Sequence, residues 1–131
     1  MPAVAGLTDL DELLRSMAPV VRDGEYVVVS LPEVGDLPAE ATVREDEGIT
    51  VVLRRETADA AGLAYDLVAG WITLTVHSSL EAVGLTAAFA TALTEAGISC
   101  NVLAGAFHDH LLVPVGDVAR AVEVLRRLGD R

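Results

Sequence analysis

The second half of the chain carries an ordered series of strand and helix signals that few folds can accommodate. WITLTV (71–76) is rich in β-branched and aromatic residues, which favour a strand. Apolar residues then recur at helical spacing as far as about Ala96, and Gly97 suits the end of that helix. The predicted order is a strand (71–76), a helix (78–96), two strands (99–105 and 111–115) and a final helix (116–128).

This order is that of the ferredoxin-like βαββαβ unit without its last strand. Such a unit lays its helices on one face of an antiparallel sheet. The missing strand has two possible sources, the first half of this chain or another chain. An open sheet edge or a bare helix face would favour dimerisation, since pairing covers both.

The first half has weaker signals of the same kinds. Thr8 suits the start of a short amphipathic helix closed by Pro19, and 22–24 is typical of a turn. YVVVSL (26–31) predicts a buried strand. A loop is expected over 32–40 and a hairpin over 42–53. A short helix over 56–61 should end at Gly62, and a brief strand should follow over 63–68.

An internal sequence similarity relates the two halves. ADAAGLAYDL (58–67) and LTEAGISCNV (93–102) share a helix end, an Ala-Gly stop, an apolar residue and a predicted strand. Such self-similarity favours two divergent copies of one unit. We therefore expect an α+β protein of two ferredoxin-like halves, with antiparallel sheets covered by helices, and a boundary near Ala69 that separates 1–69 from 70–131.

Composition excludes several classes of function. The net charge of −11 repels phosphate backbones and anionic lipids, which argues against nucleic-acid and membrane partners. Cys100 is the only cysteine, so a reducing, cytoplasmic setting and a buried, inert thiol are expected. The N-terminus lacks the basic start of a signal peptide. With 52% hydrophobic residues, much apolar surface must be hidden in a core or a subunit interface.

Three histidines are the most reactive residues by type. His108, Asp109 and His110 form one cluster, and His77 is a third imidazole, so a zinc site is conceivable. The alternative is that the cluster is a hairpin turn and that His77 lies at a polar elbow, which we favour because nothing brings His77 to the cluster. Ser78 and Ser79 lack the GxSxG context of a nucleophile. We expect no metal, no cofactor and no catalysis.

The segment from His77 to Thr86 has a clearer physical meaning. A strand ends and a helix begins there, so unpaired backbone N–H groups face outward. Together with the helix dipole these groups suit a carboxylate or another small anion, and Gly84 lets a ligand approach the backbone. The alternative is a well-capped helix start in which Gly84 serves helix–sheet packing.

A long segment resembles a known family. The resemblance rests on the segment WITLTVHSSLEAVGLTAAFATALTEAGISCNVLAGAFHDHLLVP (71–114) and is supported by VREDEGITVVLRRE (43–56). Over roughly 8–128 the chain resembles the ACT-like domain family, in particular small bacterial tandem ACT proteins. The resemblance implies ferredoxin-like modules that pair side by side and bind amino acids or related small molecules at the interface.

The resemblance also implies a ligand site. It would be formed by the first strand-to-helix loop of the second half and by the strand and turn that face it. On this chain these residues are His77, Ser78, Ser79, Val83, Gly84, Leu85, Asn101, Gly105 and Asp109. The carboxylate of Asp109 would hold a cationic group of the ligand, and the loop N–H groups would hold its carboxylate.

These expectations define two hypotheses of function. The first is a non-catalytic regulatory protein that senses a small molecule, an amino acid by resemblance, as a homodimer acting through a separate protein partner. The second is a protein–protein interaction or structural adaptor whose ligand site is vestigial.

Overall fold

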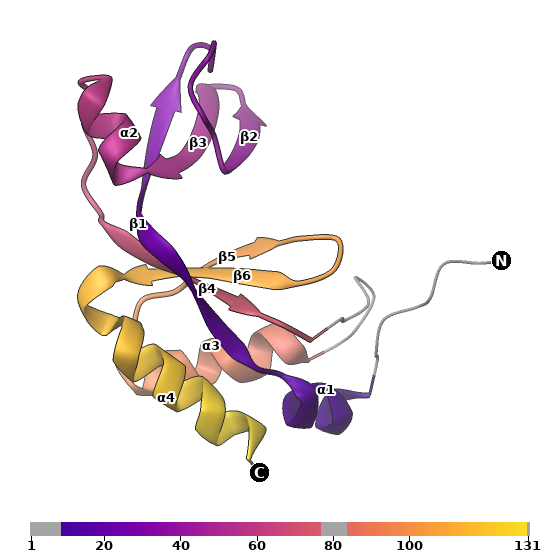
Figure 1. Cartoon of the computed structure of the whole chain (residues 1–131). Coiled ribbons are helices and arrows are strands. Elements are labelled where there is room, and N and C mark those ends of the chain that lie inside the picture. Colours follow the sequence, from indigo (N-terminus) through magenta and orange to yellow (C-terminus); the bar gives the residue numbers. More distant parts are fainter. Residues whose placement is uncertain (1–8, 77–83, 131) are drawn as a thin grey trace, which may run out of the picture.

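The protein is built on one curled antiparallel sheet (Figure 1). The computed structural model describes residues 9–76 and 84–130. The strand order is β2-β3-β1-β4-β6-β5. The strands are β1 (Pro19–Leu31), β2 (Ala41–Glu45), β3 (Gly48–Arg54), β4 (Ala69–Leu74), β5 (Asn101–Ala104) and β6 (Asp109–Pro114). The helices are α1 (Leu10–Ser16), α2 (Arg55–Ala60), α3 (Leu85–Glu95) and α4 (Val118–Gly129), with a 3-10 turn, η1 (Val115–Asp117), before α4.

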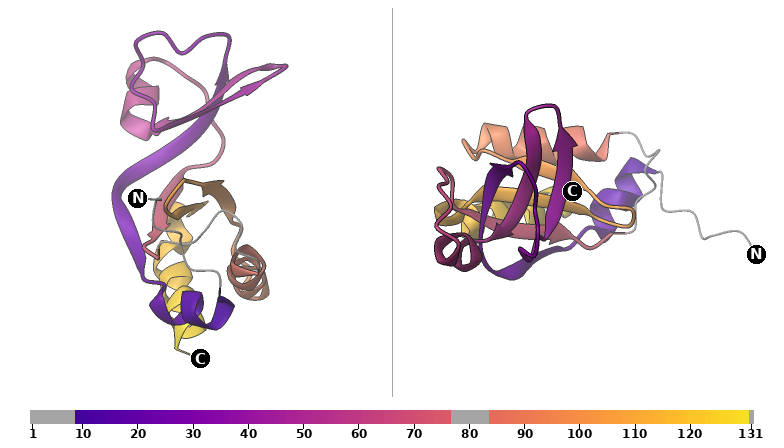
Figure 2. Two further views of the ribbon diagram at one scale, coloured as in Figure 1. Left: turned by 90° about the vertical axis from the view of Figure 1, so that its right-hand side faces the viewer. Right: turned by 90° about the horizontal axis from the view of Figure 1, so that it is seen from above.

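The long strand β1 belongs to both halves of the molecule. Its first residues, Pro19 to Arg22, pair with β4, as does Tyr26 after a shift in register. Tyr26 to Leu31 pair with β3 on the other side. Figure 2 shows β1 as one curved ribbon running from one half to the other. Gly24 lies in the shifted segment with φ +97°, a conformation that glycine adopts without strain. The predicted turn at 22–24 was therefore wrong, because glycine bends the strand here instead of ending it.

The shared strand also supplies the piece that the second half lacks. The first part of β1, β4, β6 and β5 are neighbours in that order, α3 connects β4 to β5, and α4 follows β6, in the manner of a ferredoxin-like unit. Of the two predicted sources, the first half of the chain provides the strand. This arrangement confirms the α+β fold with an antiparallel sheet, while the domain boundary near Ala69 stays a prediction.

The first half forms a smaller unit around a tight hairpin. β2 and β3 pair through a two-residue turn at Asp46 and Glu47, as predicted, and 32–40 is a loop. The helix α2 is followed by Gly62 with φ +68°, also as predicted. The brief strand predicted at 63–68 was wrong, because its apolar side chains pack against the cluster around Val27 and Leu53 and form no ladder.

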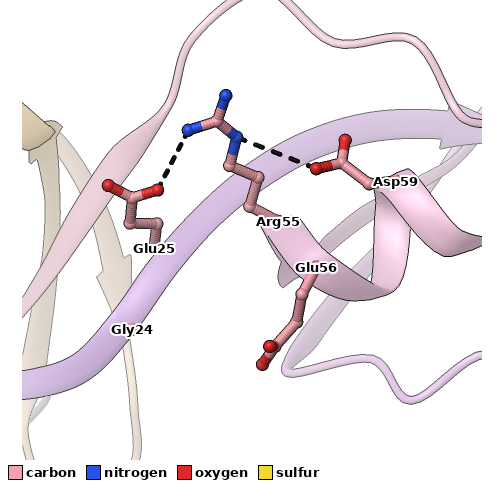
Figure 3. A pocket seen from close by; sticks show the side chains of 5 residues that line it. All are labelled: Gly24, Glu25, Arg55, Glu56 and Asp59. Carbon is pink, nitrogen blue, oxygen red and sulfur yellow. Dashed lines mark hydrogen bonds and ion pairs between the residues drawn. The ribbon is translucent and has the colours of Figure 1, made fainter.

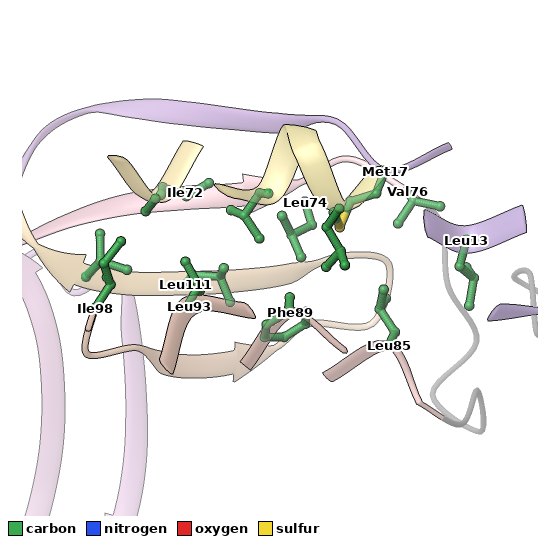
Figure 4. Packing of buried hydrophobic residues seen from close by; sticks show 14 residues of the cluster. Leu13, Met17, Ile72, Leu74, Val76, Leu85, Phe89, Leu93, Ile98 and Leu111 are labelled. Carbon is green, nitrogen blue, oxygen red and sulfur yellow. The ribbon is translucent and has the colours of Figure 1, made fainter. Parts of the chain in front are cut away.

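The principal core lies between the sheet and three helices. Ile72 and Leu74 of β4 and Leu111 of β6 point toward Phe89 of α3, which is fully buried (Figure 4). Alternate residues of β4, Trp71 and Thr73, therefore lie on the opposite face. Helix α1 joins this core and begins at Asp9, whose Oδ1 accepts a hydrogen bond from the backbone N–H of Glu12 at 2.9 Å. The predicted cap, Thr8, lies outside the described residues.

A second, smaller cluster fills the opposite face where the two halves meet. It consists of Tyr26, Val52, Ala69, Trp71 and Leu112. The rings of Tyr26 and Trp71 lie 5.2 Å apart, so strands of both halves share one packed interface. Within the described residues, none of the helices has the length and apolar character needed to cross a bilayer.

Candidate functional site

The turn between β5 and β6 lies beside the end of β4. Leu74 pairs directly with Asp109 in the β4–β6 ladder. One step further, Nδ1 of His108 lies 3.3 Å from the carbonyl oxygen of Val76. The end of the described segment at Val76 therefore lies beside this turn.

Part of the predicted site lies outside the described residues. These positions are His77, Ser78, Ser79 and Val83. The described chain resumes at Gly84, which precedes α3 with φ +98°. A Cβ atom on Gly84 would lie 3.1 Å from Cδ2 of Leu10, so this glycine lets α1 pack against the start of α3. Helix α3 begins at Leu85, several residues later than the sequence suggested.

Two further predicted residues have clear structural roles. Leu85 is 4% exposed and belongs to the principal core. Gly105 donates its backbone N–H to the carbonyl oxygen of His108 at 2.9 Å, and a Cβ atom on Gly105 would lie only 2.9 Å from that oxygen. Gly105 therefore permits the tight turn that presents Asp109. The turn predicted at 108–110 lies earlier in the chain, at 105–108, because Asp109 and His110 are the first residues of β6.

Asn101 and Asp109 are not brought together. Asn101 pairs with Leu112, which lies three residues from Asp109 along β6 and so about 10 Å away. Instead, Asn101 borders an apolar cavity of about 260 Å³ between the β2–β3 hairpin and β5. Antiparallel pairing thus assigns the two residues to opposite ends of the same hairpin.

The carboxylate of Asp109 is half buried and forms no ion pair with any of the described residues. Burial raises the pKa of Asp109, and the neighbouring His110 lowers that pKa to a smaller extent. Among residues 9–76 and 84–130, no arginine or histidine nitrogen lies within the 4.0 Å of an ion pair with this carboxylate. A desolvated carboxylate of this kind favours a positively charged group brought by a ligand.

His110 connects Asp109 to the face shared by the two halves. Its Nδ1 accepts a hydrogen bond from Nε1 of Trp71 at 3.2 Å and lies 3.0 Å from Oγ1 of Thr73. Burial lowers the pKa of His110, and the positive charge of Arg22 lowers it further. Arg22 lies over the ring of Trp71 with its Cζ 4.0 Å from the ring centroid.

The role of Arg22 had not been predicted from the sequence. Its neighbours in the chain, Asp23 and Gly24, are typical of a turn. The sequence therefore predicted a loop position for Arg22 and no role in a site. The alternation of Trp71 and Thr73 with core residues was the available indication that a polar face existed on β4.

A separate charged pocket of about 340 Å³ lies beside the bend of β1 (Figure 3). Arg55 donates there to Glu25 at 3.0 Å and to the hydroxyl of Tyr65 at 3.0 Å, and it lies 4.0 Å from Asp59. Its guanidinium is thus held by this chain's own groups. Across the described part of the chain, no group of three or more histidine, cysteine or acidic residues could hold a metal ion.

Family comparisons agree with this architecture. One ACT domain model matches residues 5–70 and another matches residues 66–127. The chain belongs to the ACT domain family. ACT domains are regulatory modules, and two of them in tandem support a regulatory, ligand-sensing role.

Several solved structures share this fold. A Vibrio cholerae protein of unknown function, described as a possible transport protein, is 46% identical, with a TM-score of 0.84 over 92% of this chain and 95% of that one. The regulatory subunit of aspartate kinase from Thermus flavus has a TM-score of 0.64 at 7% identity, covering 87% and 98% of the two chains. Escherichia coli aspartokinase III, solved with aspartate and ADP, has a TM-score of 0.63 at 12% identity, covering 87% of this chain and 33% of that one.

At these low identities the two kinase likenesses concern the fold alone. Among curated protein sequences, none matches this chain.

Proposed function

We propose that this protein is a non-catalytic ACT regulator that senses an amino acid and acts through a separate protein partner in the cytoplasm, as a homodimer. The observation that carries the proposal is the half-buried carboxylate of Asp109, which has no ion-pair partner among the described residues. An ammonium group is the natural partner for such a carboxylate, because its positive charge and N–H donors compensate for the hydration that burial removes.

The location of Asp109 supports a ligand of amino-acid size. Asp109 follows the turn that contacts Val76, and the segment leading to Gly84 starts at that point. Backbone N–H groups near the start of α3 are suited to the ligand's carboxylate, as they are at other helix starts. The two charged groups of an amino acid would then have separate partners.

The shared strand offers a route from ligand to partner. Residues of β1 pair with β4 in one half and with β3 in the other. A ligand that changes the position of β4 therefore acts on β1, and through β1 on the hairpin of the first half. A protein partner that contacts either half would experience the change.

The test is a thermal-shift screen of the purified chain against the twenty amino acids. A ligand present at a hundred times its dissociation constant should stabilise the protein by about 2.7 kcal/mol. Asp109→Asn should abolish the shift. Asp117→Asn should keep it, because that carboxylate pairs with Arg120 at the start of α4.

One outcome would contradict the sensing role, and another would contradict the assignment of Asp109 as the anchor of the ligand. If none of the twenty amino acids raises the melting temperature, the sensing role fails and the adaptor hypothesis is favoured. If an amino acid stabilises wild type and Asp109→Asn equally, the role stands but Asp109 is not the anchor.

A further inference from the structure

Two arginines from different halves of the molecule converge on one aromatic pair. Arg22 of β1 lies over Trp71 with its Cζ 4.0 Å from the ring centroid. Arg54, the last residue of β3, lies over Tyr26 at 5.4 Å. Because the rings of Tyr26 and Trp71 are themselves in contact, the two guanidinium groups share one platform. We refer to Arg22, Arg54, Tyr26 and Trp71 as the arginine platform.

Local packing holds the platform in place. The hydroxyl of Tyr26 donates to the carbonyl oxygen of Asp23 at 2.6 Å, which fixes the ring beneath Arg54. A Cβ atom on Gly24 would lie 2.4 Å from Nη1 of Arg54, so the guanidinium packs where only glycine leaves room. The bend of β1 thus positions the Tyr26 ring and leaves room for the guanidinium group of Arg54.

A single carboxylate occupies the platform. Glu40 places Oε2 at 3.3 Å from Nη1 of Arg22 and Oε1 at 3.8 Å from Nε of Arg54. Its backbone is tied to β3, because the N–H of Glu40 donates to the carbonyl oxygen of Val52 at 2.8 Å. Neither arginine receives the short, paired contacts of a bidentate guanidinium–carboxylate bond.

The platform is positive in a strongly acidic protein. Two arginines face one glutamate, although the chain as a whole has a net charge of −11. The positive charge of Arg22 reaches as far as His110, whose pKa it lowers. Within the described residues, Glu40 makes the only ion pairs of Arg22 and Arg54, so most of their N–H groups remain available to a ligand.

We propose that the arginine platform is a binding site for a small carboxylate anion, which takes the place of the Glu40 side chain between Arg22 and Arg54. Glu40 is the internal stand-in for that ligand: its carboxylate bridges both guanidinium groups but binds each one weakly. This site is distinct from the one proposed at Asp109 and does not depend on it. A bound anion would free Glu40 and so act on the start of β2, next to the junction of the two halves.

The fluorescence of Trp71 gives a direct readout. Trp71 is the only tryptophan of the chain and lies directly under Arg22. The probe is sodium malonate, titrated at constant ionic strength with sodium chloride making up the balance. Glu40→Gln removes the competing carboxylate and should bind malonate about tenfold more tightly than wild type, the ratio expected for one charge-assisted contact. Adding Arg54→Gln should abolish the saturable change.

Matched controls separate the site from a general effect of charge. Glu123→Gln also removes one carboxylate from an arginine pair, but on α4, and should titrate as wild type. Asp109→Asn should retain the malonate response, so failure of the amino-acid proposal leaves this one standing. Inorganic phosphate, at the same ionic strength, should bind more weakly than malonate.

Three results would overturn the proposal. The first is a Glu40→Gln titration that does not saturate or that matches Glu123→Gln. The second is an unchanged response after Arg54→Gln. The third is phosphate binding as tight as malonate, which would remove the assignment to carboxylates. If Glu40→Gln does not fold, Arg54→Gln in the otherwise wild-type chain decides, since it should abolish the weaker wild-type response.

Discussion

The Nε1–H group of Trp71 donates a hydrogen bond of 3.2 Å to Nδ1 of His110. Trp71 can only donate, so Nδ1 of His110 must be unprotonated and the neutral ring carries its proton on Nε2. The lowered pKa of His110 agrees with this state. One buried indole thus selects the tautomer of the histidine that follows Asp109, and it does so on the face where both halves of the molecule meet.

Acidification should destabilise the protein through His110. The folded-state pKa of His110 is lowered, so the unfolded chain binds the proton more readily, and stability falls as the pH drops through about 6.5, the unfolded value. Urea unfolding at a series of pH values measures this dependence. His110→Asn should show a smaller loss between pH 7.5 and about 5.5. An identical loss in wild type and variant would contradict the assignment.

Asp109→Asn should leave the protein at least as stable as wild type at pH 7. Burial raises the pKa of Asp109, so the ionised form carries a cost that the amide does not. In wild type, the folded state binds the proton of Asp109 more tightly than the unfolded chain does. The free energy of unfolding therefore rises as the pH falls through the raised folded-state pKa of this group. Asp117→Asn, which breaks the ion pair with Arg120, serves as the control in the same thermal melts. A clear drop in the melting temperature of Asp109→Asn would show an unrecognised favourable partner.

Gly70→Ala should destabilise the second half. A Cβ atom on Gly70 of β4 would lie 2.2 Å from Cγ2 of Val118, the first residue of α4, so helix and strand must separate. The expected loss is about 1–3 kcal/mol in urea unfolding. The double variant with Val118→Ala should recover part of the loss, because the clashing methyl group is gone. Purely additive losses would show that this contact is not the cause.

Phe89→Ala should be among the most destabilising truncations. Phe89 is fully buried between α3 and the sheet, and its removal should cost about 3–5 kcal/mol. Phe107 is 64% exposed in the turn that precedes β6, and Phe107→Ala should cost less than about 1 kcal/mol. Denaturant unfolding of both variants gives the comparison. Similar losses in the two would mean that the core is not centred on Phe89.

Much of the second half was predictable because its signals are local. The strand at WITLTV (71–76), the helix that ends before Gly97 and the two short strands of the β5–β6 hairpin all follow from side-chain propensity and periodicity. In the first half, the β2–β3 hairpin and the helix before Gly62 followed in the same way. The errors concern β1 and the segment after α2, where local signals for turn and strand were overridden by pairing and packing.

The candidate site was only partly predictable. Asp109 and Gly105 stay predicted site residues; the structure places Gly105 in the turn after β5 and Asp109 at the start of β6, opposite Leu74 of β4. The separation of Asn101 from Asp109 depends on the register of β5 against β6, which composition does not reveal. The arginine platform was not predicted, because Arg22 and Arg54 lie far apart in the chain and meet only through the curl of the sheet.

The sequence alone indicated most of the strands and helices, two related halves and a strongly negative net charge. Only the tertiary structure decided that β1 serves both halves, because Arg-Asp-Gly is equally compatible with a turn and with a bent strand. That choice depends on the partners available to the backbone, which are β4 from Pro19 to Tyr26 and β3 from Tyr26 onward. Such hydrogen bonds join residues distant in the chain, whereas propensity and periodicity act between neighbours.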